Sequence, residues 1–141
     1  MSEINDWNAA IAAEFRANAG IVGGQFAGVA LLLLHTTGAK THATRVNPLA
    51  YLDDNGSYYV FAAYGGAPIH PDWYFNLRAH PEVTVEVGSE TFTAQAIEVT
   101  GPERERIYAA QMARSAQFAH YTKNTTRVIP IIELRRLATA E

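Results

Sequence analysis

Apolar residues recur every three or four positions at the start of the chain, which is the spacing of one face of a helix. This set consists of Ile4, Trp7, Ile11, Ala12 and Phe15. Glycine commonly follows the last turn of a helix. The pattern therefore predicts an N-terminal helix over residues 1–20 that ends near Gly20.

From residue 27 the pattern changes to that of strands. The run AGVALLLLHTT at 27–37 has apolar residues at consecutive positions, which predicts a strand buried on both faces. Residues 41–66 predict two more strands around DDNG, a strong hairpin signal because Asn and Gly tolerate positive φ. We expect these first three strands to form a meander.

The second half of the chain begins with a predicted short helix, followed by a hairpin. Pro71 and Asp72 start the helix, Pro81 ends it, and Trp73 and Leu77 point inward. Residues 83–100 alternate apolar and polar side chains on both sides of GSE. This alternation predicts a hairpin with one face in water.

A longer helix and a last strand complete the pattern. The helix is predicted over residues 101–123, and Ile107, Tyr108, Met112 and Phe118 lie on roughly one side of it. The strand RVIPIIELRRL at 127–137 contains Pro130, which lacks an N–H and so confines the strand to an edge or a bulge.

Six mostly antiparallel strands with peripheral helices predict a mainly β (α+β) fold, a small closed or split β-barrel. The short helix follows the third strand and the longer helix precedes the last. We expect one domain over residues 1–141, with the barrel core at 28–136.

Composition limits the function. The 141 residues include no Cys, which excludes disulfides, thiolate zinc sites and a Cys nucleophile. The formal net charge of −3 argues against nucleic-acid binding, so any anion site must be local. MSEINDWNAA lacks the pattern of a secretory signal, and the cytoplasm is the expected location. The five His residues lack the spacing of a helical metal pair, so no metal is expected.

The stretch HTTGAKTHATR at 35–45 combines a glycine, hydroxyls and two cations, Lys40 and Arg45. Gly38 permits a sharp turn, and Thr36, Thr37 and Thr41 carry donors. Together they suit a phosphate or carboxylate. The alternative is a solvated β-turn that uses Lys and Thr for solubility.

Two further stretches carry candidate chemistry. In FAAYGGAP, the small residues Ala62 and Ala63 and the pair Gly65 and Gly66 allow a flat heterocycle to approach the backbone; the alternative is a glycine bulge at a barrel rim. Tyr121, near the end of the long helix, could donate a proton to a substrate oxygen or simply cover an apolar surface.

Taken together, LLLLHTTGAKTHATRVNPLAY, VFAAYGGAPIHPDWYFNL and TTRVIPII resemble the deazaflavin-dependent nitroreductase family of actinobacteria. The resemblance covers residues 15–136. It implies a split β-barrel related to flavin reductases and reduced coenzyme F420, an 8-hydroxy-5-deazaflavin, as hydride donor. The acceptor would be a small electron-poor molecule: a quinone, an enone or a nitroaromatic.

By the same resemblance, the turn at 36–45 binds the phospholactate and oligoglutamate tail, and Lys40 and Arg45 are its anion anchors. Tyr121 is the candidate catalytic proton donor, and Phe118 and Tyr121 bind the substrate. The family implies these cofactor-binding residues: Thr36, Thr37, Gly38, Lys40, Thr41, Arg45, Asn47, Pro48, Ala62, Ala63, Tyr64, Gly65, Gly66, Trp73 and Asn76.

Two alternatives remain at this stage, an FMN-binding oxidoreductase on the same barrel and a non-catalytic coenzyme-binding protein. The apolar N-terminal helix would suit either peripheral membrane contact or packing on the barrel. An edge strand at 128–134 would suit a homodimer.

Overall fold

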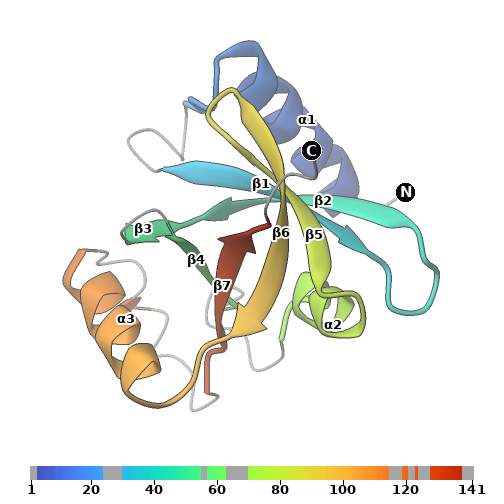
Figure 1. Cartoon of the computed structure of the whole chain (residues 1–141). Coiled ribbons are helices and arrows are strands. Elements are labelled where there is room, and N and C mark those ends of the chain that lie inside the picture. Colours follow the sequence, from blue (N-terminus) through green and yellow to red (C-terminus); the bar gives the residue numbers. More distant parts are fainter. Residues whose placement is uncertain are drawn as a thin grey trace.

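A computed structural model of the chain describes residues 3–23, 30–54, 57–62, 70–114, 119–120, 123 and 128–137, with the backbone alone for residues 3–7. The helices are α1 (Glu3–Ala17), α2 (Asp72–Ala79) and α3 (Gly101–Arg114). They surround a single sheet (Figure 1). In the described part of the chain, none of the helices combines the length and apolarity that a membrane crossing needs.

The sheet has seven strands in the order β2-β1-β5-β6-β7-β4-β3. Every pairing in it is antiparallel. The strands are β1 (Leu31–Thr37), β2 (Thr44–Ala50), β3 (Leu52–Asp54), β4 (Ser57–Phe61), β5 (Glu82–Val87), β6 (Glu90–Glu98) and β7 (Ile131–Arg136). The sheet curls into a half-barrel of the α+β class (Figure 1).

The curl follows from one interruption of the predicted second strand. β2 and β3 stand at opposite ends of the sheet order, yet only Tyr51 separates them in sequence. The expectation of six strands is therefore wrong, because the predicted second strand is divided in two. Its first half pairs with β1 and its second half with β4, so the expected meander is bent rather than flat.

The last strand also differs from expectation. β7 lies between β6 and β4 and pairs with both, so it is neither an edge strand nor a bulge. Pro130 immediately precedes the strand, where its missing N–H costs no ladder bond, and its carbonyl accepts a hydrogen bond from Ala62 N–H at 3.0 Å. The open edges are β2 and β3, and residues 128–134 offer no edge for a homodimer.

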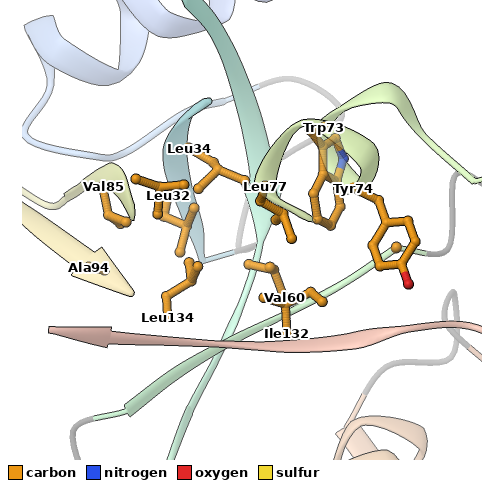
Figure 2. Packing of buried hydrophobic residues seen from close by; sticks show 12 residues of the cluster. Leu32, Leu34, Val60, Trp73, Tyr74, Leu77, Val85, Ala94, Ile132 and Leu134 are labelled. Carbon is orange, nitrogen blue, oxygen red and sulfur yellow. The ribbon is translucent and has the colours of Figure 1, made fainter. Parts of the chain in front are cut away.

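The main core fills the inside of the curl. Leu32 and Leu34 of β1 are fully buried there, as expected for a strand with two buried faces. Figure 2 shows Trp73 and Leu77 of α2 converging with Leu34 on Val60 of β4. Burial of each such side chain stabilises the fold by about 1.5–3 kcal/mol. The predicted inward face of the short helix is confirmed.

α1 packs on the outer face of β1. Phe15 and Ala12 meet Leu31 and Leu33, whose side chains alternate with the inward pair. Arg16 donates two hydrogen bonds to Glu86 of β5, and His35 of β1 contacts the same carboxylate at 2.6 Å. The predicted N-terminal helix is confirmed, with its end at Ala17.

α3 packs on a different outer face, against β3, β4 and β7. Ile107 is fully buried in a cluster with Leu52, Tyr59 and Ile131. The cluster confirms Ile107 as part of the predicted apolar side of the helix, and Tyr108 and Met112 pack beside Ile129. Phe118 lies outside the described residues. α2 thus packs against β1 and β4 inside the curl, and α3 packs on β3, β4 and β7 outside it.

Candidate functional site

The turn between β1 and β2 is closed by its own backbone. Gly38 N–H donates to the Ala43 carbonyl at 2.8 Å, and His42 N–H donates to the Gly38 carbonyl at 3.0 Å. Ala43 N–H donates to the Thr41 hydroxyl oxygen at 3.2 Å. A Cβ on Gly38 would lie 2.5 Å from that same oxygen, so a larger residue here would displace the Thr41 side chain.

α2 holds the turn from inside the fold through Asn76. The Asn76 side-chain oxygen accepts a hydrogen bond from Ala39 N–H at 3.1 Å, and its nitrogen donates to the Thr36 hydroxyl at 3.2 Å. Asn76 is 8% exposed and Thr36 2% exposed. Both ends of one buried amide are therefore used to fix the turn relative to α2.

The cations of the turn have no acidic partner among the residues that the structure describes. Lys40 and Arg45 are exposed, and the ion pairs found among the described residues include neither of them. The sequence contains no Asp or Glu between Glu14 and Asp53. By contrast, Arg16, Arg106, Arg135 and Arg136 each contact a carboxylate. The turn is thus locally positive in a chain that is acidic overall, and it can bind an anion.

The other predicted residues of this region lie in or behind the ladder. Thr37 is half-buried and pairs with Thr44. Asn47 and Pro48 are half-buried in β2, opposite β1. Trp73 is buried in the core, in agreement with the interpretation from its helical position. These residues belong to the β1–β2 ladder and to the core beneath it.

Tyr74 fixes α2 to strand β6. Its hydroxyl donates a hydrogen bond to Glu98 of β6 at 2.8 Å. Burial of the ring and the contact with Glu98 raise the pKa of Tyr74, so the phenol keeps its proton. The ring of His70 lies 4.8 Å from that of Tyr74.

The proposed ring-binding segment begins at Ala62. Ala62 is fully buried at the end of β4, and Phe61 beside it packs with Tyr108, Met112 and Ile129. Ala63, Tyr64, Gly65, Gly66, Phe118 and Tyr121 lie outside the described residues. Their assignment to the ring and substrate sites stays a prediction.

The sequence did not predict the positions of two residues, His42 and Gln111. His42 lies in the turn with φ of +60°, and its ring contacts that of His80. Gln111 of α3 is buried, and its side-chain oxygen has no hydrogen-bond partner among the described residues. A His at a turn position was visible in the sequence, whereas the burial of Gln111 required the packing of α3 on the sheet.

A surface cavity of about 300 Å³ lies elsewhere, between the end of α1 and the β5–β6 turn. Arg16 and Glu86 line it, and they already bind each other. Because its charged groups are paired, this cavity offers less to an anion than the open turn does.

Comparisons with known proteins agree with this geometry. The model of the F420H(2)-dependent quinone reductase family matches residues 7–135. An F420H(2)-dependent quinone reductase of Mycobacterium tuberculosis strain H37Rv is 39% identical over 108 residues, which cover 74% of this chain and 72% of the relative.

Two solved structures are also similar. The F420-H2 dependent reductase FDR-A has a TM-score of 0.68 and 37% identity, over 74% of this chain and 93% of that one. A structure described as a domain-swapped dimer has a TM-score of 0.71 and 32% identity, over 94% of this chain and all of the other. The resemblance to F420-dependent reductases is thereby confirmed, and the chain belongs to the F420H(2)-dependent quinone reductase family.

Proposed function

We propose that this protein is an F420-dependent oxidoreductase that reduces a quinone, with enones and nitroaromatics as further acceptor classes. Reduced F420, when bound, supplies a hydride, which is chemistry that no side chain provides. Family membership supports this function. The structural observation that carries it is the pair of exposed cations, Lys40 and Arg45, which form no ion pair within the described part of the chain and stand on a turn fixed by Asn76.

The turn fits the chemistry of the coenzyme's tail, which carries a phosphate diester and several carboxylates. Lys40 and Arg45 supply positive charge, and no carboxylate of the surrounding sequence competes for them. Gly38 brings the two sides of the turn close together. The Thr41 oxygen accepts a bond from Ala43, which leaves its O–H available to an anion.

Each part of this chain then has a distinct role. Lys40 and Arg45 bind the tail, Asn76 and Thr36 position the turn, and Trp73 supports it from the core. We place the ring along Ala62–Gly66 of a flavin-reductase-like split β-barrel. Tyr121 is the proposed group that delivers a proton to the acceptor oxygen.

The first experiment is a fluorescence titration of the purified protein with F420 and, separately, with FMN. We expect saturable binding of F420 and no binding of FMN. Arg45→Ala should weaken F420 binding by about tenfold, as expected for one charge-assisted contact. Arg135→Ala, on β7 and three strands away from β1 in the sheet order, should not. Preference for FMN would favour the FMN-binding oxidoreductase, and an unchanged affinity in Arg45→Ala would exclude that residue as an anchor.

A turnover assay separates an enzyme from a coenzyme-binding protein. With reduced F420 and menadione, we expect the protein to produce the quinol. Tyr121→Phe should lower kcat while the dissociation constant of F420 stays the same. Tight F420 binding without turnover of any quinone, enone or nitroaromatic would support coenzyme storage instead.

A further inference from the structure

His42 occupies a backbone conformation that histidine rarely adopts. Its φ is +60°, in the left-handed region that favours glycine. The residue is exposed, so burial in the core does not explain the choice of side chain. A strained residue within the proposed anion-binding turn is a reason to look for a role of its side chain.

The His42 ring is supported by α2. Its centroid lies 5.4 Å from that of His80, with the ring planes at 62° in an edge-on arrangement. His80 is the residue that ends α2, and its N–H donates to the Asn76 carbonyl at 2.9 Å. The same helix therefore contacts the turn twice, through the Asn76 amide and through this ring.

The charges around His42 are nearly all positive. Its own turn carries Lys40, the following strand β2 begins with Thr44 and Arg45, and α2 contributes His80. The first carboxylate that follows His80 in the sequence is that of Glu82, the first residue of β5, and it is exposed. A bound anion would offset the mutual repulsion of positive charges at this turn.

We propose that His42 is a third anion-binding residue of this turn, which binds the tail of the deazaflavin coenzyme in its protonated form. The proposal rests on the proposed function. Its ligand class is the anionic oxygens of a phosphate diester or a carboxylate, which a protonated imidazole binds by charge-assisted hydrogen bonds. His80 is a positioning residue, because its ring holds that of His42 against α2.

Proton linkage gives the sign of the effect. If the anion binds the protonated imidazole, binding takes up a proton, and affinity falls as the pH rises through the range in which histidine titrates. Lysine and arginine side chains ordinarily stay charged over that range, so a pH dependence of this sign points to histidine.

The test measures the dissociation constant of F420 between about pH 5.5 and about pH 8.5 in the wild type and in His42→Gly. Glycine adopts positive φ freely, so this variant keeps the turn and should be at least as stable as the wild type in thermal unfolding. We expect it to bind F420 about fivefold more weakly at the acid end, the size of one exposed ionic contact, and equally well at the alkaline end.

Four controls identify the source of the effect. The same deazaflavin without its phospholactate and glutamate tail should show equal affinity for the wild type and His42→Gly at every pH. F420 with a single glutamate separates the phosphate from the longer carboxylate chain. His80→Phe keeps an aromatic ring against His42 and should keep the pH dependence, as should His120→Gln outside the turn.

The outcomes are distinguishable. Absence of F420 binding at every pH contradicts the proposed function itself. F420 binding with the same pH profile in the wild type and His42→Gly leaves that function intact and overturns the role of His42. Equal weakening of His42→Gly at all pH values also overturns it, because a loss of turn geometry would have that effect.

Discussion

Single residues of this protein shape the turn that we propose as the anion-binding site. Asn76 was expected to bind the cofactor, yet its amide is buried and bonded at both ends to the turn. Gly38 has no side chain to offer, and a Cβ at this position would lie 2.5 Å from the Thr41 hydroxyl oxygen that caps the turn. In the proposed site, Asn76 and Gly38 therefore shape the turn that presents Lys40 and Arg45.

Asn76→Ala should show this dependence. It leaves Ala39 N–H and the Thr36 hydroxyl without their partner, which costs about 2 kcal/mol of unfolding free energy. F420 affinity should fall, while the affinity for the tail-less deazaflavin should stay the same. Denaturant unfolding and fluorescence titration measure the two effects.

Asn18→Ala is the matched control for this change. Its amide bonds the Glu14 carbonyl at the exposed end of α1. Its loss should leave F420 binding unchanged. Equal loss of affinity for both deazaflavins in Asn76→Ala would show that the side chain acts on the ring site and not on the turn.

At the scale of elements, α1 is fixed to the sheet by charge and by close contact. Hydrogen bonds from Arg16 lower the pKa of Glu86; burial of the carboxylate opposes this shift, and the contact with His35 adds to it. Gly20 approaches Gly88 so closely that a Cβ would lie 2.8 Å from its Cα. These contacts join the end of α1 to the β5–β6 hairpin.

Arg16→Ala should lower the unfolding free energy near neutral pH by about 0.5–1 kcal/mol, since Arg16 is about half exposed and solvent screens the pair. Because the pKa of Glu86 is lower in the folded state, this stability is present above its unfolded pKa and is lost as pH falls through its folded pKa. The two proteins should therefore converge in stability in acid.

Urea unfolding at neutral and acid pH measures this difference. Arg135→Ala serves as its control, because Arg135 pairs with Glu133 on its own strand β7. A stability difference that stays constant from neutral pH to acid would show that Arg16 acts through packing of its aliphatic stem instead of through Glu86.

The whole molecule combines a net charge of −3 with one segment that lacks carboxylates. Anion binding at the turn therefore works against the overall charge and relies on short-range contacts. Salt screens such contacts over about 10 Å at 0.1 M. In an acidic protein, two neighbouring cations favour a ligand with several anionic groups, which can contact Lys40 and Arg45 at the same time.

Salt should accordingly weaken F420 binding, by about fivefold between about 50 mM and about 500 mM. The double variant Lys40→Gln and Arg45→Gln should bind weakly and lose most of this dependence, because it lacks the charges that salt screens. Arg135→Gln should retain it. Titrations at several salt concentrations decide the matter, and a full salt dependence in the double variant would place the anion site elsewhere.

Many of the helices and strands of this protein can be predicted from the local sequence pattern. The helix at α1 and the short helix at α2 follow from apolar spacing and from Pro71 and Pro81, and the β5–β6 hairpin follows from alternation around GSE. Such signals depend only on neighbours in the chain. The three motifs likewise identified the family without any knowledge of pairing.

Pairing between distant segments could not be read in this way. The break at Tyr51 and the central place of β7 depend on which strands meet when the sheet curls, and no local period encodes this choice. The bond from Asn76 to the turn joins residues 37 positions apart. The residue types and turns are local properties of the chain, whereas the curl, the burial of Thr36 and the fixed turn exist only once the core is packed.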